Sequence, residues 1–226
     1  MTPANPVPQG TATMTRGMVL LFAFCCGAIV ANIYYAQPII GLIAPDIGLT
    51  STMASLIVSL TQIGYALGLF FLVPLGDLLE NRRLMIITTL VAIASLLGAA
   101  FTDQPNVFLL ISLLVGFSSV SVQILIPLAA HLAPEESRGR VVGGIMGGLL
   151  LGILLARPVS SVIADHFGWR AMFVIAAVLM AAISVVLALT IPKRKPDHSA
   201  SYGQLLGSLW TLLRNQPVLR QRAFYQ

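Results

Sequence analysis

The stretch AMFVIAAVLMAAISVVLALTI at residues 171–191 decides the class of fold, because it runs without one charged side chain. A helix needs about 20 predominantly apolar residues to cross the hydrocarbon core of a bilayer. Five further runs meet or approach this length. They do not alternate polar with apolar residues, as the strands of a membrane barrel do. In order along the chain, these runs occupy residues 17–44, 53–76, 84–101, 107–131 and 141–164.

The composition of the 226-residue chain excludes a soluble domain. Hydrophobic residues make up 57% and charged residues 9%, whereas soluble domains carry about 25% charged residues. Such a chain has too little polar surface to cover a globule, which rules out an ordinary cytosolic enzyme, a disordered chain and a nucleic-acid-binding module. The predicted fold class is therefore all-α integral membrane, with six transmembrane helices in one bundle. We expect no nucleic-acid partner.

The 13 Lys and Arg residues predict how the chain sits in the membrane, because cytoplasmic connections are enriched in them. Arg157 lies inside a span and Arg170 is alone on one side, while the others gather on the opposite side. Both termini of this multi-pass protein are therefore expected in the cytoplasm. We predict a disordered cytoplasmic tail at 1–16, a six-span bundle at 17–191 and a cytoplasmic linker with an amphipathic helix at 192–226.

Two connections that lie three spans apart carry a similar motif. Asp77 precedes Arg82 by five residues, and Asp165 precedes Arg170 by the same spacing. Because three spans separate them, the two connections lie on opposite faces of the membrane, as an inverted three-plus-three repeat requires. Chance explains two short matches as well as a repeat does, and both interpretations stay open at this point.

Arg157 is the charged residue that interrupts the middle of an apolar run, between Leu155 and Val159. A guanidinium at the centre of a membrane helix costs about 2.5–3.5 kcal/mol on insertion scales, and it stays charged. The favoured interpretation is a substrate-binding or coupling cation that faces a central cavity. The alternative is a structural ion pair, although no Asp or Glu lies at the centre of any predicted span.

Uncharged polar residues interrupt three of the other runs and are further candidates for the lining of a substrate cavity. Such groups orient small molecules by hydrogen bonds, and they also hold neighbouring helices together. The sequence leaves both roles open for each of them. The cavity candidates beside Arg157 are Asn32, Tyr35, Gln37, Gln62 and Gln123.

The run at 141–164 also carries a glycine series that ends near a proline. Gly148 and Gly152 are four residues apart, which places both on one helix face and permits a close helix contact. Pro158 lacks a backbone N–H and kinks or loosens the helix around it. We therefore assign Gly148, Gly152 and Pro158 to helix packing and bending.

Three segments resemble the N-terminal half of a major facilitator superfamily transporter, and in particular the bacterial efflux-type members that export drugs or sugars. They are the polar stretch at 32–38, the connection at 76–83 and the FGWR element at 167–170. Full members of this family have twelve spans. The resemblance therefore implies a second six-helix half that this chain lacks, supplied by the same full-length chain or by a second copy. It also implies the bacterial inner membrane as the location.

The connection at 76–83 is similar to the family's signature loop, whose Asp is a conformational latch that releases during switching. By this resemblance Asp77 is the latch carboxylate, and Arg82 and Arg83 are the basic pair that follows it. The chain departs from the family pattern at three positions, which are Val73, Leu78 and Glu80.

The function implied is secondary active transport of a small-molecule substrate by alternating access, with efflux and proton coupling expected from the family. Two other classes stay open: a truncated fragment or regulatory membrane subunit that does not transport, and a membrane-embedded enzyme. An enzyme needs polar catalytic residues gathered at one depth, and the sequence shows no such cluster, so we predict no catalytic residue. It shows no metal-ligand spacing and no phosphate-binding loop either, so no metal and no cofactor are expected.

Overall fold

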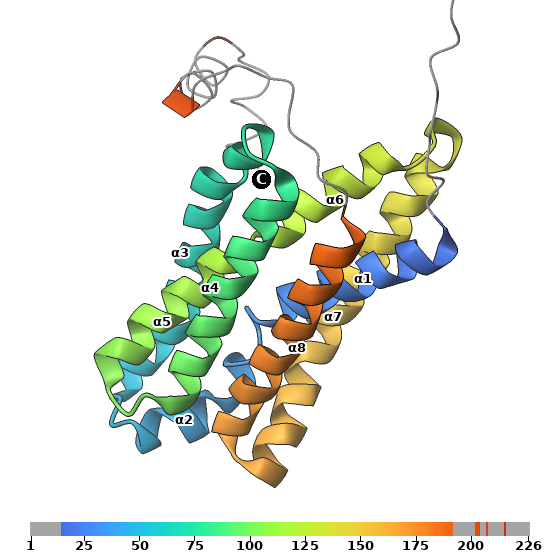
Figure 1. Cartoon of the computed structure of the whole chain (residues 1–226). Helices are drawn as coiled ribbons and strands as arrows, with labels where there is room; N and C mark the ends of the chain where they lie inside the picture. Colours follow the sequence, from blue (N-terminus) through green and yellow to red (C-terminus); the bar gives the residue numbers. More distant parts are fainter. Residues whose placement is uncertain (1–14, 192–201, 204–206, 208–214, 216–226) are drawn as a thin grey trace, which may run out of the picture.

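The computed structural model describes residues 15–191, 202–203, 207 and 215, and it folds the chain into a bundle of long helices (Figure 1). The predicted tail at 1–16 lies outside this part except for its last two residues. Nearly all of the predicted linker at 192–226 lies outside it as well.

Among the described residues, eight α-helices and three short 3-10 turns make up the bundle. Five stretches are long and apolar enough to cross a membrane, and α1 is a shorter apolar helix. The predicted all-α membrane bundle is therefore confirmed. The helices are α1 (Arg16–Ala31), α2 (Ile40–Asp46), α3 (Ser51–Leu72), α4 (Asn81–Phe101), α5 (Pro105–Ser118), α6 (Ser121–Leu132), α7 (Arg138–Phe167) and α8 (Trp169–Thr190). The 3-10 turns are η1 (Gln37–Ile39), η2 (Pro74–Asp77) and η3 (Glu135–Ser137).

The first predicted span is not one continuous helix, which corrects the expectation from hydropathy. α1 ends at Ala31, tight turns follow over residues 32–36, and η1 leads into the short α2. One cause is Pro38, which has no backbone N–H and disfavours the α conformation at the residue before it. The backbone stays hydrogen-bonded through the break, since the N–H of Tyr34 donates to the carbonyl of Ala31 at 2.9 Å.

The fourth predicted span is also broken, between α5 and α6. The hydroxyl of Ser119 donates to the carbonyl of Val115 at 2.7 Å and so competes with the helical hydrogen bonds. Two residues later, the hydroxyl of Ser121 meets the hydroxyl of Thr88 on α4 at 2.8 Å. Side-chain hydroxyls thus share backbone acceptors with the helical N–H groups at this break.

Short polar signals set the helix ends. The hydroxyls of Thr15 and Thr50 each accept a hydrogen bond at 3.3 Å, from the N–H of Met18 and of Met53 respectively. These are N-caps, which satisfy amide donors that the first turn of a helix leaves unpaired. Gly168 joins α7 to α8 with φ at +82°, a conformation that glycine adopts at little cost.

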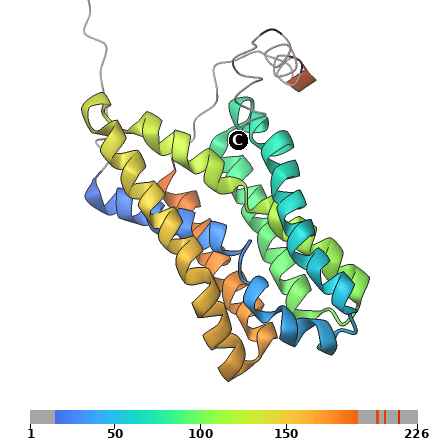
Figure 2. The ribbon, with the colours of Figure 1, turned by 180° about the vertical axis from the view of Figure 1, so that it is seen from behind.

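The helices pack in three main pairs, α1 with α7, α3 with α5, and α4 with α8. The views in Figures 1 and 2 show α1 crossing α7. Glycines lie in the first two crossings: Gly27 faces Gly152 between α1 and α7, and Gly64 and Gly116 lie between α3 and α5. A Cβ at any of these positions would overlap the backbone of the partner helix. This pairing fits an inverted three-plus-three repeat, in which the first three spans correspond to the last three. Under that correspondence the α1–α7 pair is equivalent to the α5–α3 pair, and α4 and α8 are equivalent to each other.

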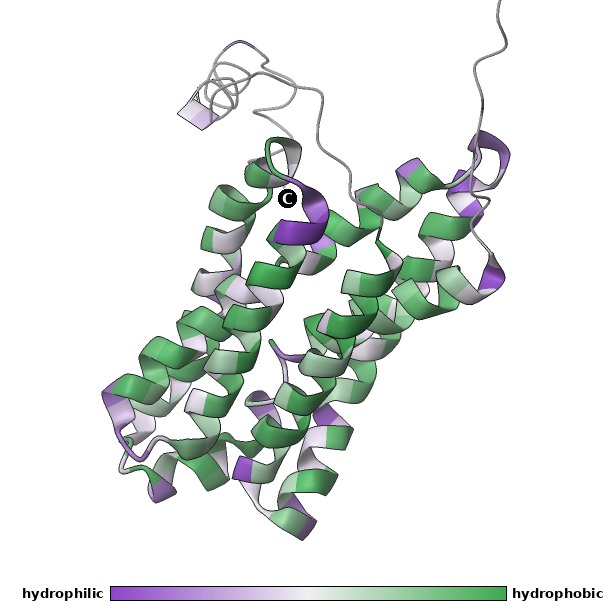
Figure 3. Cartoon of the chain, in the orientation of Figure 1, coloured by the Kyte–Doolittle hydropathy of each residue, from purple (hydrophilic) through white to green (hydrophobic). Residues whose placement is uncertain are grey.

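Apolar residues make up most of the helices of the bundle (Figure 3). α3 and α7 are the least buried of the spanning helices, with 22% and 17% of their most apolar stretches inside the bundle. Leu154 of α7 and Phe70 of α3 are more than half exposed. These two helices therefore present apolar faces that lipid or further protein would cover.

The two cysteines of the chain lie side by side in the core. Cys25 and Cys26 of α1 are 1% and 0% exposed, and both are free thiols. They pack as small apolar residues, which is a common role of buried cysteine.

Candidate functional site

Arg157 lies on α7, within a stretch that is long and apolar enough to cross a membrane. It precedes the end of α7 at Phe167 by ten residues, which is about 15 Å of helix and half the thickness of the hydrocarbon core. The helix continues through Pro158, which does not end it. The guanidinium is exposed in the bundle as it stands, so the group is available to a ligand.

Two side chains from the break in the first span contact Arg157. Its Nη2 atom donates to Oε1 of Gln37 at 2.9 Å, and its Cζ atom lies 5.8 Å from the ring centroid of Tyr34. A cation above an aromatic face is attracted by the ring quadrupole. Within the described part of the chain, no carboxylate pairs with Arg157. Neutral groups therefore orient this guanidinium and leave its charge uncompensated.

A second hydrogen bond ties the broken helix to α7 one turn further along. Ser160 is fully buried, and its hydroxyl donates to the backbone carbonyl of Tyr35 at 2.6 Å. Irregular backbone at membrane depth needs such protein partners. The bond fixes the chain two residues before Gln37, so it also positions the amide that receives Arg157. We call Arg157, Gln37 and Tyr34 the arginine cluster.

The other predicted cavity residues lie outside the arginine cluster. Gln123 donates from Nε2 to the hydroxyl of Tyr65 at 3.0 Å, and it lines a separate pocket of about 200 Å³ beside η2 and α6. Asn32 is 4% exposed, and its amide nitrogen has no hydrogen-bond partner among the described residues. It lines a pocket of about 10 Å³, which is room for about one water molecule. Gln62 is exposed on α3.

The residues predicted for helix packing and for the latch occupy other parts of the bundle. Gly148 and Gly152 lie in the crossing of α7 with α1, where Gly148 faces Ala23. The backbone of Asp77 ends η2, and its side chain lies outside the described part. The basic pair at 82–83 stands in the first turn of α4, where the helix dipole favours a nearby carboxylate.

Sequence reasoning missed a polar cluster where α2, the α4–α5 connection and α8 meet. Arg170 pairs with Asp46 and, at 2.6 Å, with Asp103. The indole nitrogen of Trp169 donates to Asp46 at 3.0 Å, and the guanidinium of Arg170 lies 4.2 Å from the centroid of that ring. Hydrogen bonds from Arg170 and then Trp169 hold the pKa of Asp46 below its ordinary value. The sequence did contain a signal for this cluster. Arg170, Asp46 and Asp103 carry opposite charges, and all three fall on the same predicted side of the membrane.

The arginine cluster combines a fixed positive charge with a polar helix break within the apolar length of the bundle. A guanidinium recognises carboxylates and phosphates through paired hydrogen bonds. A broken helix that exposes polar groups near the bilayer centre is a common way to build a substrate site in secondary transporters. The fold and the site together therefore define a polytopic membrane protein with a polar helix break of the kind found in secondary transporters.

The chain belongs to the major facilitator superfamily, whose family model matches residues 19–225. Over 210 residues it is 44% identical to the uncharacterized transporter YgaY of Escherichia coli O157:H7. That match covers 93% of this chain and 53% of the relative. Over 217 residues it is 36% identical to a protein of Streptomyces coelicolor named "Probable transporter SCO4007", covering 96% of this chain and 50% of the relative. The chain thus spans about half the length of the curated relatives it matches.

Solved structures of this superfamily have the same fold. The xylose transporter XylE from E. coli, in a partially occluded inward-open conformation, matches with a TM-score of 0.68 at 16% identity. That match covers 77% of this chain and 49% of XylE. The inward-open conformation of XylE matches with a TM-score of 0.64 over 91% of this chain and 54% of XylE. The bundle is therefore one half of the superfamily fold.

Proposed function

We propose that this chain supplies one half of a secondary transporter that moves a small polar or anionic solute by alternating access. The observation that carries the proposal is the arginine cluster, in which neutral partners hold a charged group at mid-membrane depth. An intramembrane cation that lacks a structural counter-ion is expected to serve a substrate or coupling role. Arg157 supplies the charge, and Gln37 and Tyr34 orient it.

The second half of the site comes from a further six-helix bundle, either in the same full-length chain or in a second copy. Two observations support this part of the proposal. The relatives are about twice as long as the chain, and α3 and α7 leave wide apolar faces uncovered. Arg157 projects from one of these two helices, so the second bundle would close the cavity over it. In this arrangement the solute lies between the bundles.

We further propose efflux, proton coupling and a location in the bacterial inner membrane with both termini in the cytoplasm. The support is the resemblance of the segments at 32–38, 76–83 and 167–170 to efflux-type members, together with the side on which Lys and Arg gather. The described acidic residues lie at helix ends and in connections. The second bundle is therefore expected to hold the coupling carboxylate. In proteoliposomes, solute movement should follow an imposed proton gradient and stop with an uncoupler.

The experiment that tests the solute class is thermal unfolding of the purified full-length protein with a panel of probes. The panel contains gluconate, glucose 6-phosphate, xylose and the cation ethidium. A probe that binds the folded state raises the unfolding midpoint. We expect an anionic or polyhydroxylated probe to do so, and Arg157→Gln to weaken its binding about ten- to hundred-fold, the usual range for a lost hydrogen bond to a charged group.

Two further variants sharpen this test. Arg157→Lys keeps the charge but loses the planar fork, so it should retain part of the response. His166→Gln lies on the same helix, is exposed, and should leave the response unchanged. A response to ethidium alone, unaltered by Arg157→Gln, would contradict the proposal.

A further inference from the structure

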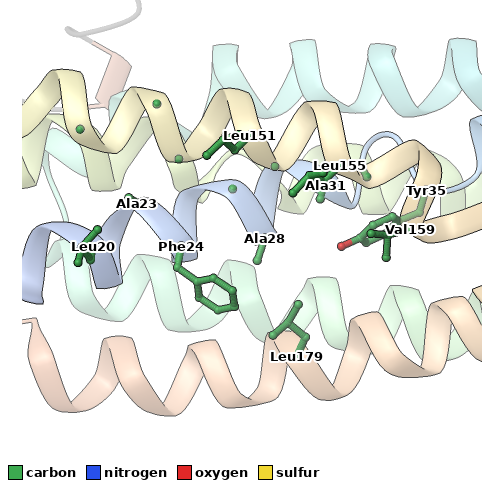
Figure 4. Close-up of a pocket in the computed structure, with 16 residues that line it drawn as sticks. Leu20, Ala23, Phe24, Ala28, Ala31, Tyr35, Leu151, Leu155, Val159 and Leu179 are labelled. Carbon is green, nitrogen blue, oxygen red and sulfur yellow. The ribbon is translucent and has the colours of Figure 1, made fainter.

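A further cavity lies on the outside of the bundle, and one of its ends is lined by Tyr35 and Ala156, the chain neighbours of Tyr34 and Arg157. It is an open groove of about 720 Å³ between α1, α7 and α8. Figure 4 shows Phe24 of α1, Leu151 and Leu155 of α7, and Leu179 of α8 turned toward it. Tyr35 is the single lining residue that carries a polar side-chain atom. A groove of this composition suits an apolar ligand.

Glycines keep the groove open along α7. Gly144 and Gly147 line it, and a Cβ placed on Gly147 would meet no atom within 4 Å. The lining runs from Leu20 to Tyr35 on the first span and from Gly144 to Val159 on α7. Along α7 that distance is about 22 Å, which exceeds the depth of one lipid leaflet, about 15 Å of hydrocarbon. A single acyl chain therefore fits lengthwise.

One end of the groove carries two arginines on the faces that line it. Arg16 precedes the lining residue Leu20 by one turn of α1, and Arg140 precedes Gly144 by one turn of α7. Residues four apart share a helix face, so both guanidinium groups stand at the same mouth of the groove. Both residues are exposed, and neither forms an ion pair within the described part of the chain.

The groove also faces away from the proposed partner bundle. Leu151, Leu155 and Val159 line it at four-residue spacing. Arg157 lies two positions from Leu155, which is about 200° around the helix. Since Arg157 would face the second bundle across the solute cavity, the groove on the other side of α7 stays open to the membrane.

From this combination we propose that the groove is a binding site for an anionic phospholipid. One acyl chain lies along the glycine-lined wall of α7, and the phosphate of the head group lies between Arg16 and Arg140. An apolar channel with positive charge at one mouth matches the two parts of such a lipid, because basic residues at the membrane surface attract anionic head groups. A zwitterionic lipid offers the same chain but no net charge.

The test is native mass spectrometry of the purified full-length protein, titrated with palmitoyl-oleoyl phosphatidylglycerol and, in parallel, with the phosphatidylcholine of the same chains. We expect one phosphatidylglycerol to bind more tightly than phosphatidylcholine. Gly147→Leu fills the groove and should abolish that bound lipid. Gly143→Leu is the matched control, because position 143 is equally open but does not line the groove.

The double substitution Arg16→Gln and Arg140→Gln tests the head-group contact without touching the helix packing. Each lost arginine should weaken phosphatidylglycerol binding about five-fold and leave phosphatidylcholine unchanged. The proposal is overturned if wild type binds both lipids alike, or if Gly147→Leu and Gly143→Leu retain phosphatidylglycerol equally. Equal retention of phosphatidylglycerol by Gly147→Leu and Gly143→Leu is also the result expected if the partner bundle covers the groove and no lipid enters it.

Discussion

The α1–α7 and α3–α5 pairs pack by the same means, yet they differ in chemistry. Both crossings are made close by glycines, at which an added Cβ would overlap the opposite backbone. The spacing that aligns Asp77 with Asp165 also aligns Gly64 with Gly152. The same alignment places Leu69 of α3 opposite Arg157 of α7. One copy of the repeat therefore carries a charge where the other carries a leucine.

The difference shows that the packing of this bundle and its polar site are separable. The glycine contacts recur in both copies because each half needs its helices to approach closely. The arginine cluster exists in one copy, since it requires Arg157 and the hydroxyl of Ser160 on α7, where α3 carries Leu69 and Leu72. Substitutions at equivalent positions of the two copies should therefore have similar effects on stability where they change the packing. They should have different effects where they change the arginine cluster.

The largest effect is expected from Gly64→Leu and Gly152→Leu. A Cβ on Gly64 would overlap the carbonyl of Leu113, and one on Gly152 would overlap Gly27. Overpacking typically destabilises by about 1–3 kcal/mol and occasionally by more, and we expect the larger effect here because the added side chain meets backbone that cannot move aside. Both variants should lose most folded protein to a similar extent, as measured by the unfolding midpoint and the monodisperse yield in detergent.

Gly139→Leu is the control for these two variants, because a Cβ there meets open space. It should leave both readouts near those of wild type. A severe loss for one of the two glycine variants and a mild loss for the other would break the equivalence of the two crossings.

An intermediate effect is expected when the charge is moved between the copies. Leu69→Arg places a guanidinium on α3 among exposed apolar residues, and a charge near the centre of a membrane helix costs about 2.5–3.5 kcal/mol. Arg157→Leu removes such a charge, so its unfolding midpoint should match or exceed that of wild type. A Leu69→Arg protein as stable as wild type would show that α3 also faces a wet cavity.

The smallest effect is expected at the polar cluster of Asp46, Arg170 and Trp169. The folded state lowers the pKa of Asp46, so the carboxylate contributes stability that is complete above its unfolded pKa of about 4. That contribution is lost as the pH falls through the lowered folded pKa. Asp46→Asn should therefore lower the unfolding midpoint slightly at neutral pH and make no difference in strong acid. If the unfolding midpoints of wild type and Asp46→Asn fall equally as the pH is lowered, the pairing of Asp46 with Arg170 does not contribute to stability.

Hydropathy predicted the membrane bundle correctly, but it could not place the two helix breaks. The run at 17–44 is apolar on both sides of Ala36, so burial in lipid alone favours a continuous helix. What ends the helix is local competition by Pro38 and by turn hydrogen bonds. The break at Ser119 has the same kind of cause. An average of hydropathy over a run does not include the effects of a proline or of local hydrogen bonds.

The sequence predicted which polar residues belong to candidate sites, but it did not predict which of them contact one another. Arg157 and Gln37 stood out as polar groups inside apolar runs, but nothing local indicates that residues 120 positions apart meet. Their contact follows from the glycine crossing of α1 with α7, which is a tertiary property. Asn32 had equal standing in the sequence, and it lies in a small separate pocket instead.

The burial of Cys25 and Cys26 has a practical consequence for spectroscopy. Thiol reagents need an accessible thiolate, and these two side chains are almost completely inside the core. They are the two cysteines in the sequence. Cys25 and Cys26 should therefore stay unlabelled under mild maleimide or nitroxide treatment. Single cysteines introduced at exposed sites of this bundle, such as Leu154, can then be labelled without prior removal of Cys25 and Cys26.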